Sequence, residues 1–190
     1  MKLAGLLFFL FLSSCLLGQS SDSLQYQFNN AVEHYKFDDA INYGEGWVEL
    51  DSTNINAHYK LSRVYLQKGR ISEAEESLNK ALSIDSTHIP SLNQLAKLYR
   101  RADRLAEALE VYENLMLTDT LNPYYPREAA ELAYPQQRLN KAFHYFRLCL
   151  YLDSTSTPCF LGLAKMNMDL KMYDEADSLE VARYILDFYG

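Results

Sequence analysis

Side chains that commonly carry out chemistry are sparse in this sequence. No two of its four histidines stand in an HExxH arrangement, and none has a cysteine nearby, so a zinc site is not predicted. The sequence also lacks a GxSxG nucleophile elbow and glycine-rich phosphate loops of the GxGxxG or GxxxxGK[ST] type. We therefore expect a protein that is not an enzyme and that holds no cofactor or metal ion. The histidines, interpreted as packing or capping residues, are His34, His58, His88 and His144.

The three cysteines are too few for a disulfide-rich scaffold. Cys149 and Cys159 are near enough in sequence to pair in an exported protein, but the separation of their Cα atoms decides whether they can. We favour the simpler interpretation that Cys149 is a buried small apolar residue.

Residues 1–20 have the composition of a secretory signal peptide. Lys2 precedes an uncharged apolar stretch, and small residues follow it. The apolar run is shorter than the ~20 residues that a membrane-spanning helix needs. The segment 12–15 (LSSC) resembles a bacterial lipobox, which would make Cys15 the lipidated first residue, whereas cleavage a few residues later would leave a soluble start. We expect export to the periplasm or cell envelope, with membrane contact only through a lipid on Cys15.

Composition limits the class of protein and of partner. Hydrophobic residues make up 48% of the 190 residues, which is typical of a folded protein. With 7 glycines and 5 prolines there are few turn formers, which favours long helices. The 18 basic and 25 acidic residues give a net charge of −7, which argues against binding to nucleic acid phosphates.

Residues of one kind return every 34 positions along the chain. Five units of this length after a leader of 20 residues account for all 190 positions. The expected repeats cover 21–54, 55–88, 89–122, 123–156 and 157–190. Two positions hold the same residue in every unit and define the period. The aspartate column is Asp51, Asp85, Asp119, Asp153 and Asp187, and the alanine column is Ala40, Ala74, Ala108, Ala142 and Ala176.

Each unit has the pattern of two helices joined by a short turn. In the second unit, apolar residues at helical spacing flank the turn at 68–70, whose central glycine suits a left-handed helix end. Ser72 and Glu75 have the spacing of a capping box for the helix that follows. In the fourth unit, Pro135 predicts that the first helix ends by Ala133.

Two units share a set of apolar, small and aromatic positions. They are Leu61, Ser62, Tyr65, Gly69, Ala74, Leu78 and Ala81 in the second unit, and Leu95, Ala96, Tyr99, Ala108 and Tyr112 in the third. This set resembles the tetratricopeptide repeat (TPR) motif, and the resemblance covers residues 21–190. It implies an all-α fold, a right-handed α-solenoid of five helix-turn-helix repeats. The first unit departs from the motif, because Gly44 and Trp47 reverse the usual large-then-small order.

The resemblance also implies that ligands contact the exposed side of each first helix, where positions four apart lie one turn from each other. These positions hold amides and cations, which suit an extended peptide with acidic side chains. A solvated helix face without a ligand accounts for the same residues equally well. The predicted peptide-binding residues are Asn29, Tyr59, Arg63, Asn93, Lys97, Arg100, Arg101, Arg127, Glu131 and Lys165.

Arrays that clamp chaperone C-termini use a lysine and an asparagine four apart in the first unit. Gln25 and Asn29 occupy that place here, so this ligand is not predicted. We expect a non-catalytic scaffold of the envelope that binds a protein or peptide. The alternative is a sensory or regulatory ectodomain of a longer signalling protein, which would require sequence beyond Gly190.

The C-terminal end is rich in apolar residues that no later helix in the sequence would cover. Contiguous exposed apolar groups commonly mark contacts, so we expect this end to self-associate or to dock on a partner. The alternative is that the last turn frays and its aromatic residues fold back onto the fifth unit. The residues concerned are Tyr184, Ile185, Phe188 and Tyr189.

Overall fold

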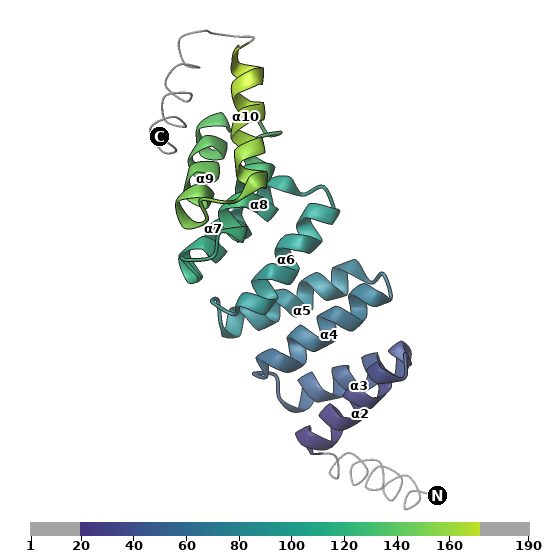
Figure 1. Ribbon diagram of the computed structural model, residues 1–190. Helices are drawn as coiled ribbons and strands as arrows, with labels where there is room; N and C mark the ends of the chain where they lie inside the picture. Colours follow the sequence, from purple (N-terminus) through teal and green to yellow (C-terminus); the bar gives the residue numbers. More distant parts are fainter. Residues whose placement is uncertain (1–19, 172–190) are drawn as a thin grey trace, which may run out of the picture. The chain divides into compact units, whose positions relative to one another are not determined.

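The computed structural model describes residues 20–171, and all regular structure among them is α-helical (Figure 1). These residues belong to two compact units, of which unit 1 ends at Ser91 and unit 2 begins at Leu92. Unit 1 contains α2 (Ser21–Glu33), α3 (Phe37–Leu50), α4 (Ile55–Gln67) and α5 (Ile71–Ile84). Unit 2 contains most of α6 (Ile89–Arg101), followed by α7 (Leu105–Thr118), α8 (Tyr124–Ala133), α9 (Leu139–Leu152) and α10 (Thr157–Lys171).

Antiparallel hairpins are the building blocks within both units. In unit 1, α2 packs on α3, α3 on α4, and α4 on α5; in unit 2, α8 lies between α7 and α9. None of the described helices combines the length and apolar character that a bilayer-spanning segment requires.

The alanine column lies at the centre of these hairpins. Each of its described members is on the second helix of a hairpin and is 0% exposed, so a larger side chain there would displace the opposing helix. Large apolar residues one turn later complete the core, and Leu78 and Tyr112 are also 0% exposed. The buried alanines are Ala40, Ala74, Ala108 and Ala142.

The turn inside each hairpin places one residue in the left-handed backbone region. In the turn after α4, the amide of Gly69 donates to Leu66 and that of Arg70 donates to Tyr65, which closes the helix end. Gly69 has φ +72°, as its place in the sequence predicts. The equivalent positions hold side chains, at a cost of about 1 kcal/mol each. They are Tyr35 (φ 58°), Asp103 (φ 58°) and Gln137 (φ 56°).

The aspartate column forms the turn between hairpins. Oδ1 of Asp85 accepts from the amide of Thr87 at 2.9 Å and from its hydroxyl at 2.7 Å. These side-chain and backbone hydrogen bonds lower the pKa of Asp85. Asp51 with Thr53 and Asp153 with Thr155 repeat the arrangement.

The predicted capping box at Ser72 and Glu75 is wrong. Helix α5 begins at Ile71, so Ser72 lies inside its first turn and Arg70 takes the N-cap position without a side-chain cap. The guanidinium of Arg70 instead contacts Glu73 at 2.8 Å. An ion pair therefore spans the first turn of α5, and no side chain caps its N-terminus.

The reversed order of Gly44 and Trp47 has a packing reason. A Cβ on Gly44 would lie 2.8 Å from Cδ1 of Leu61 and 3.0 Å from the ring of Phe28, so any larger residue would have to displace these side chains. Trp47 is 1% exposed, and its indole nitrogen donates to Ser21 at 2.9 Å. A small and a large side chain have therefore exchanged places within the buried core.

The end of α8 at Ala133 confirms the prediction drawn from Pro135. Two carbonyl groups near this end accept hydrogen bonds from the side-chain amide of Gln136. That amide lies 2.9 Å from the carbonyl oxygen of Leu132 and 3.2 Å from that of Leu105.

The preferred interpretation of Cys149 as an unpaired residue is wrong. Cys149 on α9 and Cys159 on α10 form a disulfide, with their Cα atoms 6.4 Å apart and both residues 0% exposed. The turn between hairpins brings the two helices within the span of a disulfide, a proximity that sequence spacing cannot establish.

Several expectations fall outside the described residues. They are the leader with Cys15, the second helix of the fifth repeat, and the terminal residues Tyr184, Ile185, Phe188 and Tyr189.

Candidate functional site

The exposed side of the first helix in each hairpin is here called the first-helix face. In unit 1 it is formed by α2 and α4, which are joined by a 3.2 Å hydrogen bond from Nζ of Lys60 to Oδ1 of Asn29. Arg63 is exposed one turn further along α4, and within residues 20–171 it forms no ion pair. Of the predicted residues, Asn29 and Arg63 therefore share one surface.

Tyr59, also predicted to bind a ligand, is partly occupied in packing. Its ring meets the ring of His88 edge-on, with 5.6 Å between centroids. Nδ1 of His88 lies 2.8 Å from the hydroxyl oxygen of Ser91, which is buried. Tyr59 thus contacts the turn that precedes α6, and only part of its side chain faces solvent.

Unit 2 places an ion-pair network on its first-helix face. Glu128 on α8 is only 4% exposed, and its carboxylate binds the guanidinium groups of Arg127 (2.7 Å) and Arg100. Both arginines also lie 4.0 Å from Glu131. Burial and the charge of Glu128 raise the pKa of Glu131 above its usual value. The network brings together three predicted residues, Arg100, Arg127 and Glu131.

This network changes what the arginines can do. Two cations expected to meet acidic groups of a ligand are already paired with carboxylates of the chain. Sequence reasoning missed Glu128, and also Lys60, because both lie one position beyond the expected facing residues. A signal existed, since Lys60 and Glu128 occupy the same place in units that are two repeats, or 68 residues, apart, and both are charged.

The remaining predicted residues of unit 2 are of two kinds. Asn93 donates to the hydroxyl of Tyr125 at 3.3 Å, and Nζ of Lys165 lies 5.5 Å from the ring centroid of Tyr134. Lys97 and Arg101 are exposed, and neither forms an ion pair with a residue in the part of the chain that the structure describes.

A hollow of about 310 Å³ opens on the first-helix face of unit 1. Apolar and aromatic side chains supply most of its lining, two amide side chains add to it, and both charged groups that line it are cations. Its lining comes from α2, α4, the turn that precedes α3 and the first residue of α3. The residues are Phe28, Asn29, Val32, Tyr35, Phe37, Lys60, Arg63, Val64 and Gln67.

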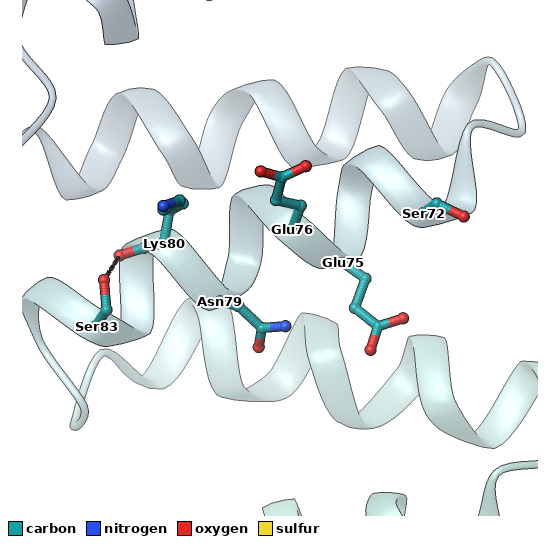
Figure 2. Close-up of a pocket in the computed structure, with 6 residues that line it drawn as sticks. All are labelled: Ser72, Glu75, Glu76, Asn79, Lys80 and Ser83. Carbon is teal, nitrogen blue, oxygen red and sulfur yellow. Dashed lines mark hydrogen bonds between the residues drawn. The ribbon is translucent and has the colours of Figure 1, made fainter.

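A second hollow, of about 440 Å³, runs along α5, the second helix of its hairpin. Figure 2 shows its six polar side chains spread along one helix and pointing to different sides of it; among them, the hydroxyl of Ser83 donates to the carbonyl of Lys80 at 2.7 Å. They do not converge on a common point. Across residues 20–171, no three His, Cys, Asp or Glu side chains are arranged to hold a metal ion.

Comparison with known proteins defines the fold. Residues 33–115 match the family described as anaphase-promoting complex, cyclosome, subunit 3. None of the curated proteins compared with the chain matches it. A tetratricopeptide repeat protein from Parabacteroides merdae ATCC 43184 is 22% identical over 90% of this chain and 68% of its own, with a TM-score of 0.72.

Two structures of MamA are also similar. One, from Desulfovibrio magneticus RS-1, is 12% identical over 90% of this chain and 95% of its own, with a TM-score of 0.65. Another is 18% identical over 71% of this chain and 79% of its own, with a TM-score of 0.63. These likenesses confirm the predicted all-α helical repeat fold.

Proposed function

Since the chain has the tetratricopeptide repeat fold, we propose that it is a non-catalytic scaffold of the cell envelope. It binds an extended, acidic segment of a partner protein along its first-helix faces. Stacked helical repeats offer long surfaces of this kind. The observation that carries the proposal is Arg63, an exposed cation with no ion pair among the described residues, beside Asn29 and the hollow of unit 1.

The charge distribution supports an acidic partner. Arg63, Lys97 and Arg101 remain available on first helices of a chain whose net charge is −7. Such local cations steer an acidic segment toward this surface and weaken its binding as salt rises.

Two features support the envelope as the compartment. Residues 1–20 have the composition of a signal peptide. The disulfide between Cys149 and Cys159 is the kind of bond that persists in oxidising compartments.

Photo-cross-linking in intact host cells tests the binding face. A benzophenone amino acid replaces Arg63 or Lys97, and as a matched control it replaces Asn79 in the hollow along α5. We expect protein adducts from the first two positions and few from Asn79. Equal yields from all three positions, or adducts from Asn79 alone, would contradict the proposed face.

Cell fractionation and mass spectrometry of the N-terminus test the compartment. Export predicts a mature chain in the envelope fraction that lacks the leader. A fatty-acid label that disappears in Cys15→Ser would identify a lipoprotein, and a soluble start after residue 18 or 20 would identify ordinary secretion. A chain that keeps residues 1–20 in the cytoplasm would contradict export.

A further inference from the structure

The hollow of unit 1 has an apolar base and a cationic rim. Phe28 and Val64 are each 3% exposed and form part of its buried lining. Lys60 is held at the rim by its hydrogen bond to Asn29, and Arg63 stands near it on the same helix. At about 310 Å³ the hollow is at the small end of ligand pockets, so it suits one large side chain rather than a cofactor.

Tyr35 forms a wall of this hollow and is 80% exposed. Its ring meets Phe37 edge-on, with 6.1 Å between centroids, which makes a continuous aromatic surface. Its backbone has φ 58°, at the turn position where the next hairpin has Gly69. A bulky residue is disfavoured at this backbone conformation. Because the ring of Tyr35 is mostly exposed, its burial within the chain contributes little to the stability of the fold.

We propose that this hollow is the anchor subsite for one aromatic side chain of an acidic partner segment, and that Tyr35 determines its specificity. The inference rests on the proposed function and names the ligand chemistry at one site. The aromatic ring enters between Tyr35 and the base of the hollow, and carboxylates that flank it in the partner meet Arg63 and Lys60. Buried aromatic anchors of this kind dominate the affinity of many interfaces.

Fluorescence anisotropy with the full chain and labelled peptides tests the subsite. The probes are Asp-Asp-Phe-Asp-Asp, the same peptide with Ala in place of Phe, and Lys-Lys-Phe-Lys-Lys. Burial of one aromatic ring predicts that the first peptide binds about tenfold more tightly than the Ala peptide. The cationic rim predicts that the Lys peptide binds most weakly.

Two glycine variants separate the role of the ring from the effect on the backbone. Tyr35→Gly removes the ring and also relieves the left-handed conformation. Gln137→Gly relieves the same conformation in unit 2, and Gln137 is not among the residues that line the hollow. We expect Tyr35→Gly to weaken binding of the Phe peptide about fivefold, and Gln137→Gly to leave it unchanged.

Three results would overturn the subsite: no preference for Phe over Ala, unchanged binding in Tyr35→Gly, or equal loss in both glycine variants. The subsite would also be overturned if vesicles or a second copy of the chain compete for the hollow and the Phe peptide does not. If the cross-links at Arg63 and Lys97 persist in any of these cases, the proposed function stands and only the anchor fails.

Discussion

The hydroxyl of Tyr145 on α9 donates a 2.6 Å hydrogen bond to Oε1 of Glu113 on α7, and Nζ of Lys141 lies 2.7 Å from the same oxygen. Burial by itself would raise the pKa of Glu113, but the hydrogen bonds from Lys141 and Tyr145 outweigh it, so the pKa is lowered. The two second helices are thus joined by a charge-assisted contact at a half-buried carboxylate.

Because the folded-state pKa of Glu113 lies below its unfolded value, its contribution to stability is present at neutral pH and disappears as pH falls through the folded pKa. We expect Glu113→Gln to lower the free energy of unfolding by about 1 kcal/mol at pH 7, after solvent screening. The difference from the unchanged protein should be smaller at pH 3 than at pH 7. Urea denaturation at both pH values measures it, and a deficit of equal size at both would contradict the electrostatic origin.

The alanine column should not tolerate a charge. Ala108 is 0% exposed, so Ala108→Asp places an unpaired carboxylate in the core and should cost several kcal/mol, as should Ala74→Asp. Ala106→Asp is the matched control, because Ala106 is exposed in the first turn of the same helix, α7. Thermal melts that move equally for Ala106→Asp and Ala108→Asp would show that burial is not the cause.

The disulfide should stabilise unit 2. It closes a short loop across the turn between α9 and α10, which is worth about 2–3 kcal/mol. Reductant should therefore lower the melting temperature of the protein and increase amide exchange in α10. The double variant Cys149→Ala, Cys159→Ala should melt at the lower temperature and ignore reductant. Alkylation of either cysteine in the unreduced, unfolded protein would contradict the pairing.

Binding of an acidic partner should depend on the cations that remain unpaired. We expect Arg63→Ala combined with Lys97→Ala to weaken it by about tenfold at low ionic strength, and wild-type affinity to fall as salt rises. Arg127→Ala is a poor substitute for this test, since it also removes one of the two cations that pair with the buried Glu128. Calorimetric titration at two salt concentrations distinguishes these effects. An affinity indifferent to both substitution and salt would place the site elsewhere.

Relief of the left-handed turn should stabilise the protein. Gln137→Gly and Asp103→Gly should each raise the free energy of unfolding by about 0.5–1 kcal/mol, because glycine adopts positive φ without a Cβ clash but has greater freedom in the unfolded chain. Gly69→Ala is the reverse substitution and should lower it. If all three variants match the unchanged protein, the turn conformation carries no strain.

The local elements could be read from the sequence because their causes are local. Pro135 ends α8 because a proline beyond the first turn of a helix removes a backbone hydrogen bond and clashes with the preceding turn, and a glycine in the turn at 68–70 adopts the left-handed helix end. The period of 34 predicted a stack of repeats, since one hairpin cannot bury its apolar face alone, and the resemblance to the TPR motif implied that the stack is all-α. The wrong prediction of a capping box at Ser72 shows how precisely a helix boundary must be known, because a small shift in the helix start changes which side chain caps it.

Tertiary structure alone decided the features that join residues distant in sequence. Side-chain types placed Arg100 and Arg127 on an exposed face, but only packing showed that both are paired with the buried carboxylate of Glu128. Sequence spacing left the pairing of Cys149 and Cys159 open, and the 6.4 Å separation of their Cα atoms in the folded chain decided it. In each case the energy depends on separations of a few ångströms, which the periodicity of a sequence does not determine.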